Sequence, residues 1–287
     1  MRANNFFKKN WFGLVTITFS LLVLVGALFL SGEKDDFIAA VKNMDRIWIL
    51  VAFVFILLYW LLDALTLNLL TRTMYKNYNF IESFKTGMIG LLYSALTPFS
   101  TGGQPMQIYE MNKTGIKTGD ACSIITVKSI IYQGAMTLFG VCSSFITWRF
   151  FNGVINNLFL YVFFGTVTNV VFIGCILFIC VKKNFTKSII RGFIHVLSKI
   201  KLVKNPEKTI DNANGQVDIF YSSVRALKNE RLAYLLGILV TLAQLAIFYA
   251  IPYCVYKGFH LNDAGLLYMI AANALIAMIT AFVPIPG

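Results

Sequence analysis

Long apolar runs constrain the fold of this chain more than any other feature of its sequence. A helix needs about 20 apolar residues to cross the roughly 30 Å hydrocarbon core of a membrane. Runs of this length occur at residues 11–30, 47–70, 123–147, 158–181, 232–255 and 264–282. Because 57% of the 287 residues are hydrophobic and only 13% are charged, the composition is unlike that of a soluble domain. The sequence predicts an all-α polytopic membrane protein with about six transmembrane helices, and residues 1–287 are expected to form a single integral membrane domain.

The basic residues predict how the chain is oriented. We interpret residues 11–30 as a retained helix, because the run is too long for a typical signal peptide and no convincing cleavage site follows it. With the N-terminus in the cytoplasm, most of the 25 Lys and Arg residues fall in cytoplasmic segments, as the positive-inside rule requires. The net charge of +12 is then expected to face anionic lipid, and no direct binding of nucleic acid is expected.

A broken stretch interrupts the apolar sequence after the second run. Residues 97–105 read Thr-Pro-Phe-Ser-Thr-Gly-Gly-Gln-Pro, between segments as apolar as the transmembrane runs. In hydrocarbon every backbone polar group must be paired, so irregular backbone persists only where it packs in protein or lines a wet cavity. The predicted topology also requires the stretch 87–120 to begin and end in the cytoplasm. We therefore predict a re-entrant broken-helix hairpin at residues 87–110.

The hairpin carries groups suited to a phosphate headgroup. Glycine lets a ligand approach the backbone closely, and N–H groups at a helix start bind anions without a charged side chain. The alternative is a polar loop that plugs a helix bundle, and both interpretations stay open. The candidate headgroup contacts are Thr97, Ser100, Thr101, Gly102, Gly103 and Gln104.

Two ionisable residues lie inside predicted spans, Asp63 in the second and Lys128 in the third. A charge at mid-membrane costs about 2.5 kcal/mol or more, so each should face the bundle interior, water or a partner. One interpretation is a direct ion pair that stabilises the fold. Another is that Lys128 receives an anionic headgroup while Asp63 titrates or holds Lys128 in place, and a third is that Lys128 snorkels. We interpret Gln133 and Gln244, also inside spans, as bridges between helices.

One sizeable polar insert, residues 182–231, separates the apolar runs. Residues 185–202 place apolar side chains at helical spacing among lysines and an arginine, which is typical of a helix on the inner leaflet. Asn205-Pro206 breaks this pattern, and residues 207–230 are predicted to form a second polar helix. We interpret the insert as a basic, amphipathic connector on the cytoplasmic side that is structural or docks on lipid.

The end of the sequence partly echoes the hairpin motif. Residues 282–287 read Phe-Val-Pro-Ile-Pro-Gly after an apolar run. Broken helices in both halves of a chain are typical of transporters built as inverted repeats. The other interpretation is that the prolines simply end a helix.

Enzyme signatures are scarce. The two histidines, His195 and His260, and the five irregularly spaced cysteines form no recognisable metal or nucleophile motif. We expect no catalytic residue, metal or other cofactor in this chain.

Taken together, the Thr97–Pro105 motif, Tyr109, the turn near Gly115 and Asp120, and the Pro-x-Pro-Gly ending resemble the lysylphosphatidylglycerol synthase transmembrane family. This family comprises the flippase-like membrane region of multiple-peptide-resistance proteins and stand-alone relatives. The resemblance covers essentially the whole chain. It implies a lipid-handling protein of the bacterial inner (cell) membrane that moves an anionic or aminoacylated phospholipid, such as phosphatidylglycerol or lysylphosphatidylglycerol, or a lipid carrier, between leaflets.

The resemblance also implies an alternative enzymatic function and its partners. Family members continue past the second proline motif, so we expect this chain to be truncated at its C-terminus. Lysyl transfer from lysyl-tRNA to phosphatidylglycerol, which gives resistance to cationic antibiotic peptides, is assigned in the family to a soluble domain that this sequence lacks. A lysyltransferase function would need that domain from a partner. An accessory role beside a glycosyltransferase, and assembly as a homo-oligomer, are further open predictions.

Overall fold

Helices make up all the regular structure in the residues that can be described. The computed structural model describes residues 34–97, 100–151, 158–199 and 205–280, together with Thr18, Leu22, Val23 and Gly26. Four helices in these ranges are long and apolar enough to cross a membrane. They are α3 (Arg46–Arg72), α6 (Thr118–Phe151), α7 (Leu158–Val181) and α10 (Arg231–Gly258). The predicted all-α polytopic membrane fold is confirmed.

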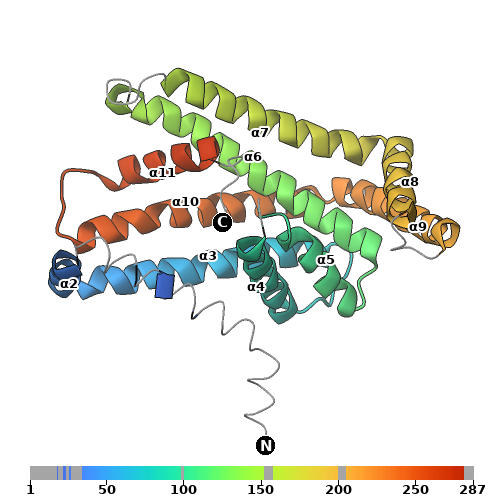
Figure 1. The fold of residues 1–287 in the computed structure, drawn as a ribbon, viewed down its shortest axis with the longest axis horizontal. Coiled ribbons are helices and arrows are strands. Elements are labelled where there is room, and N and C mark those ends of the chain that lie inside the picture. Colours follow the sequence, from blue (N-terminus) through green and yellow to red (C-terminus); the bar gives the residue numbers. More distant parts are fainter. Residues whose placement is uncertain are drawn as a thin grey trace, which may run out of the picture.

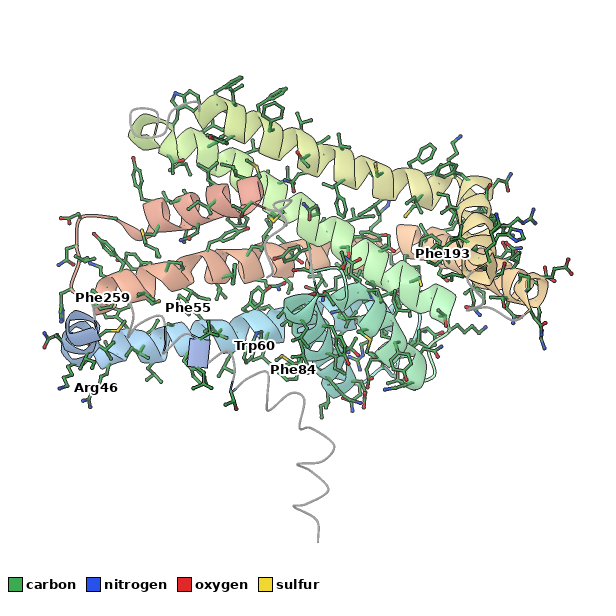
Figure 2. All side chains as sticks on the ribbon, viewed as in Figure 1. Arg46, Phe55, Trp60, Phe84, Phe193 and Phe259 are labelled. Carbon is green, nitrogen blue, oxygen red and sulfur yellow. The ribbon has the colours of Figure 1, made fainter. Side chains whose placement is uncertain are left out.

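These long helices run side by side along the longest axis of the molecule (Figure 1). The short helix α2 (Lys34–Asn43) lies at one end, and α8 (Lys183–Lys199) and α9 (Pro206–Asn229) lie at the other. The labelled side chains mark the same two ends, with Arg46 and Phe259 at the α2 end and Phe193 at the α8 end (Figure 2). Because α8 runs across the direction of the long helices, it is placed to lie along a membrane boundary.

Four of the six spans expected from the sequence are therefore present. The expected span 11–30 lies outside the described residues except for four of its positions. The expected span 264–282 is represented by α11 (Leu266–Thr280), which has 15 residues and a length of about 22 Å at 1.5 Å per residue. Helix α11 packs against α6, α7 and α10, and the proline motif at 282–287 lies outside the described residues.

The predicted hairpin is formed by α4 (Phe80–Leu96) and α5 (Gly103–Lys113). Its arms are antiparallel, because Lys85 near the start of α4 pairs with Glu110 near the end of α5 at 2.6 Å. The first arm starts earlier than the predicted residue 87, since Asn79 caps the helix by accepting a hydrogen bond from the amide of Ile81 at 3.0 Å. Both open ends of the hairpin lie towards the C-terminal end of α3, where Asn68 donates to Ser83 at 3.0 Å. Re-entry into one face of a membrane remains a prediction.

The polar insert folds as the sequence predicts, into two helices, although residues 200–204 between them lie outside the described ranges. Asp218 of α9 accepts from Lys183 and Lys187 of α8, at 2.9 and 2.6 Å. The hydrogen bonds from Lys187 and Lys183 hold the pKa of Asp218 below its ordinary value. One carboxylate therefore fixes α8 to α9.

Helix α9 is docked in turn on the start of α6. The carboxylate of Asp120 accepts hydrogen bonds from Tyr75, at 2.6 Å, and from Ser223 of α9. Burial, reinforced by the bond to Asp120, raises the pKa of the Tyr75 phenol. The amide of Gly119 donates to Gln216 at 2.9 Å, and a Cβ at Gly119 would lie 2.5 Å from the Gln216 carbonyl oxygen. Only glycine allows the two helices to approach this closely.

Replacing Gly119 with alanine should therefore push α9 away from α6. We expect Gly119→Ala to lower the free energy of unfolding by about 1–3 kcal/mol, as overpacking generally does. Unfolding in mixed detergent micelles measures this change. Gly134→Ala in the same helix is the matched control, because nothing lies within 4 Å of its Cβ position. Equal stability of the two variants would contradict the proposed close contact.

Candidate functional site

A buried ion pair lies at the centre of the candidate site. Lys128 of α6 donates to Asp63 of α3, with 2.7 Å between Nζ and Oδ2. Each side chain is only 11% exposed, so neither charge is compensated by bulk water. The direct pair considered from the sequence is thus present. Removing one partner of such a pair leaves an uncompensated charge and typically costs about 3–5 kcal/mol.

Gln244 of α10 extends the pair to a third long helix. Its amide nitrogen donates to Asp63 Oδ1 at 3.3 Å, and its side chain is 1% exposed. The sequence predicted a helix bridge at this position but did not place it at the charged pair. Tyr59 and Tyr132 also lie near Asp63. The only sequence signal that Gln244 belongs to the site was that it is a polar residue inside a span. Tyr59 and Tyr132 had no such signal, because aromatic residues are common in spans.

The first arm of the hairpin covers the ion pair. A Cβ at Gly87 of α4 would lie 3.0 Å from Asp63 Oδ2, so the glycine lets the helix backbone approach the carboxylate. The neighbouring Thr86 is fully buried, and its hydroxyl has no hydrogen-bond partner among the described residues. Asp63 and Lys128 are therefore enclosed by α4 on one side and joined to α10 on another.

The hairpin tip approaches the same region. Gln104 donates to the hydroxyl of Ser129 at 3.0 Å, and Ser129 follows Lys128 directly in α6. The structure thus brings together the two groups of residues that the sequence selected separately. Ser100, Thr101 and Gln104 are exposed at the break between α4 and α5. Ser100 has a φ of 53°, which is uncommon for a residue other than glycine.

Thr97, Gly102 and Gly103 make contacts within the hairpin. The Thr97 hydroxyl accepts from the amide of Gly102 at 2.8 Å and donates to the Tyr93 carbonyl at 2.7 Å. The Gly102 amide is therefore already used within the hairpin. A Cβ at Gly103 would lie 2.0 Å from the Ser94 hydroxyl oxygen, so this glycine allows the arms to pack. From the sequence, the glycines were interpreted as letting a ligand approach the backbone. In the structure, Gly103 also lets the two arms of the hairpin approach each other, which the sequence did not indicate.

The base of the hairpin is held by Glu110. Its carboxylate accepts from Lys85 at 2.6 Å and from Lys113 at 3.2 Å, and Glu110 is 4% exposed. The hydrogen bond from Lys85 is the main reason that the pKa of Glu110 lies below its ordinary value. Within the described ranges, no three His, Cys, Asp or Glu side chains gather in a way that could hold a metal ion.

A second polar contact marks the described end of α11. Asn169 of α7 donates to the Met278 carbonyl at 3.3 Å and accepts from Gln133 of α6. Gln133 lies about one turn beyond Ser129 along α6, so α6 passes both the hairpin tip and the end of α11. The predicted bridge at Gln133 is present. The inverted repeat remains a prediction.

The fold and this polar centre define a polytopic helical membrane protein with a charged pair beneath a broken-helix hairpin. Residues 11–287 match the family model described as the lysylphosphatidylglycerol synthase TM region, so the chain belongs to this family. A UPF0104 membrane protein of Archaeoglobus fulgidus is 24% identical over 278 residues, which cover 93% of this chain and 80% of that protein. No solved structure matches the chain.

The ion pair makes a specific prediction about stability. We expect Asp63→Asn or Lys128→Gln alone to lower the free energy of unfolding by about 3–5 kcal/mol, since each leaves one buried charge unpaired. The double variant should recover most of this loss, because two neutral amide side chains can still bond to each other. Unfolding of all four proteins in detergent micelles measures the coupling. Losses that simply add in the double variant would rule out a stabilising pair.

Proposed function

We propose that this protein moves phosphatidylglycerol or its lysyl derivative between the leaflets of a bacterial inner membrane. The observation that carries the proposal is the Asp63–Lys128 pair, which is buried in the bundle and adjoins a broken hairpin with exposed polar side chains. Buried charges in membrane spans generally mark substrate or ion pathways. Membership of the lysylphosphatidylglycerol synthase TM family supports the same substrate class.

The charges of the pair favour the lysyl lipid over phosphatidylglycerol. Lys128 can exchange the Asp63 carboxylate for a lipid phosphate, because both are anionic oxygen acceptors. The freed Asp63 then needs a cation, and Gln244 supplies only a neutral donor. A lysyl ammonium on the same lipid would compensate Asp63, whereas phosphatidylglycerol leaves it unpaired. A lipid that carries both charges is therefore expected to open the pair at the lowest cost.

The hairpin provides a polar route to this pair. Ser100, Thr101 and Gln104 lie at the break between its arms, and Gln104 reaches Ser129 beside Lys128. In this proposal a headgroup passes these side chains and the acyl chains stay in the bilayer. The N-terminus and the basic α8–α9 segment lie in the cytoplasm, as the positive-inside rule favours, so the base of the hairpin lies towards the inner leaflet and its break lies deeper in the membrane.

Lipid movement in vesicles tests the proposal. We expect Lys128→Gln to slow movement of labelled lysylphosphatidylglycerol at least about tenfold, the effect of losing roughly 1.4 kcal/mol of interaction. Gln104→Ala should slow it as well, because the route past Ser129 is altered. Lys208→Gln is the matched control, since Lys208 is exposed on α9 and distant in sequence from the pair.

The double variant Asp63→Asn/Lys128→Gln separates folding from transport. It should be nearly as stable as the wild type yet fail to move the lipid. Normal movement by a stable double variant would refute the role of the pair. Equal rates for phosphatidylglycerol and its lysyl derivative would refute the preference for two charges.

The family description also supports a second candidate, phosphatidylglycerol lysyltransferase, in which the soluble transfer domain comes from a partner or a longer chain. This candidate requires lysyl transfer from lysyl-tRNA to phosphatidylglycerol. Cells that carry only this gene from the family would then make lysylphosphatidylglycerol. Lipid extracts without that product would argue against it.

A further inference from the structure

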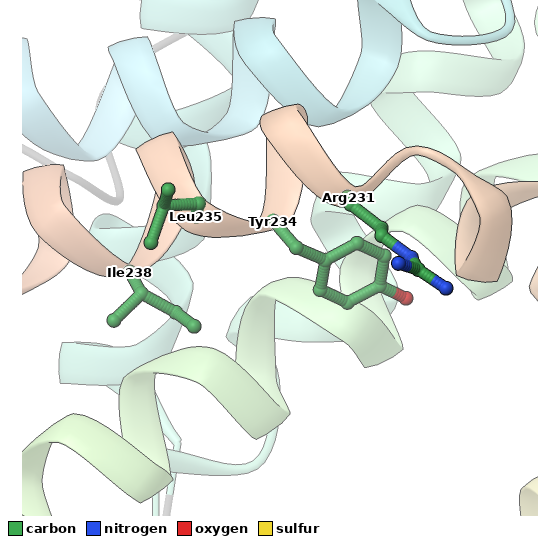
Figure 3. A pocket seen from close by; sticks show the side chains of 4 residues that line it. All are labelled: Arg231, Tyr234, Leu235 and Ile238. Atoms are coloured by element: carbon green, nitrogen blue, oxygen red, sulfur yellow. The ribbon is translucent and has the colours of Figure 1, made fainter.

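An open surface cavity of about 430 Å³ lies beside the first two turns of α10. It is lined by Arg231, Tyr234, Leu235 and Ile238, which share one face of the helix (Figure 3). The Arg231 guanidinium and the Tyr234 hydroxyl project at one end of this row, and the apolar side chains follow at the other. The cavity thus has a polar end and an apolar wall.

This cavity is separate from the ion pair. Gln244, which contacts Asp63, lies more than three helical turns beyond Arg231 and nearly two turns beyond Ile238 along α10. Tyr234 instead lies just after the end of α9 and packs against the buried cluster that includes Leu227 of α9. The cavity therefore belongs to the end of the bundle where α9 meets α10.

The position of α10 places the polar end of the cavity at a membrane boundary. Arg231 is the first residue of a candidate span, so its head is expected at the level of lipid phosphates, whichever leaflet this is. Helix α8 crosses the same end of the bundle (Figure 1). It exposes a stripe of apolar side chains at helical spacing, Phe185, Ile189, Phe193 and Val196, as an interfacial helix does.

Arg231 has a charge that the described part of the chain leaves uncompensated. It forms no salt bridge there, whereas Lys183 and Lys187 at the same end are both bound to Asp218. The guanidinium is well suited to bind a phosphate through two parallel hydrogen bonds. Leu235 is 55% exposed and Ile238 is 40% exposed, so acyl chains can pack along them.

We propose that Arg231 and Tyr234 bind the phosphate of one phospholipid from the adjoining leaflet, while Leu235 and Ile238 contact its acyl chains. This lipid is a bound neighbour of the bundle and is not the one that reaches Asp63 and Lys128. The site distinguishes phospholipids from uncharged lipids, since its one charged group recognises a phosphate. It does not depend on the proposed transport function.

Native mass spectrometry of the purified full chain with added dioleoylphosphatidylglycerol tests the site. We expect Arg231→Gln to weaken binding of the most tightly held lipid about tenfold, the usual effect of losing a charge-assisted hydrogen bond. Tyr234→Phe should weaken it less, because only a neutral hydroxyl is lost. The matched control is Arg225→Gln, which removes the same charge from an exposed position on α9 that does not line the cavity.

Further arms of the experiment identify the ligand and separate the two proposals. Dioleoylglycerol, which lacks a phosphate, should not occupy the site, and millimolar inorganic phosphate should not displace the phospholipid. Equal lipid binding by Arg231→Gln and Arg225→Gln would overturn the site, and displacement by phosphate would overturn the lipid assignment. Because Lys128→Gln should retain this lipid, its binding stays measurable even if the transport proposal fails.

Discussion

The buried bond between Asp63 and Lys128 is the interaction on which the arrangement of the bundle depends. It joins α3 to α6, Gln244 adds α10, and Gly87 lets α4 pack directly against the carboxylate. An ion pair in such surroundings is a weak source of stability compared with apolar packing, because both charges lose their hydration. The Asp63–Lys128 pair instead specifies which helices pack together, and it provides two buried charges that could pair with a charged ligand.

Helix α6 contacts both the hairpin and α11. It carries Lys128 and Ser129 next to the hairpin, and about one turn later Gln133 contacts Asn169, which holds the Met278 carbonyl of α11. Short polar bonds of this kind hold helices together where apolar side chains cannot distinguish protein from lipid. A shift of α6 along its axis would therefore alter both contacts together.

The sequence predicted the larger features because they follow from length and hydropathy. The spans within 47–70, 123–147, 158–181 and 232–255 were located. The sequence also predicted a hairpin in the region where the structure has the antiparallel helices α4 and α5, although α5 already begins at Gly103, inside the predicted break. Asp63 and Lys128 stood out because charges in apolar runs are rare. The roles of Gly87, Gly102 and Gly103 could not be predicted from the sequence. Gly87 packs against Asp63, which is distant in the sequence, and Gly102 and Gly103 contact Thr97 and Ser94 only once the hairpin has folded. The Tyr75–Asp120–Ser223 contact joins three separated segments and had no sequence signal.

The carboxylate of Glu110 has a mechanical consequence for the hairpin. Through Lys85 it joins the two arms at their base, with Lys113 of its own arm as a second donor, whereas the turn at the other end exposes Ser100 and Thr101. Because the pKa of Glu110 is lowered in the folded protein, this stabilisation is fully present above the ordinary carboxyl pKa and weakens only as the pH falls through the lowered value. The Lys85–Glu110 bond therefore keeps the two arms together at their base. The arms can shift more easily at the turn, near Ser129 and Lys128, than at the base.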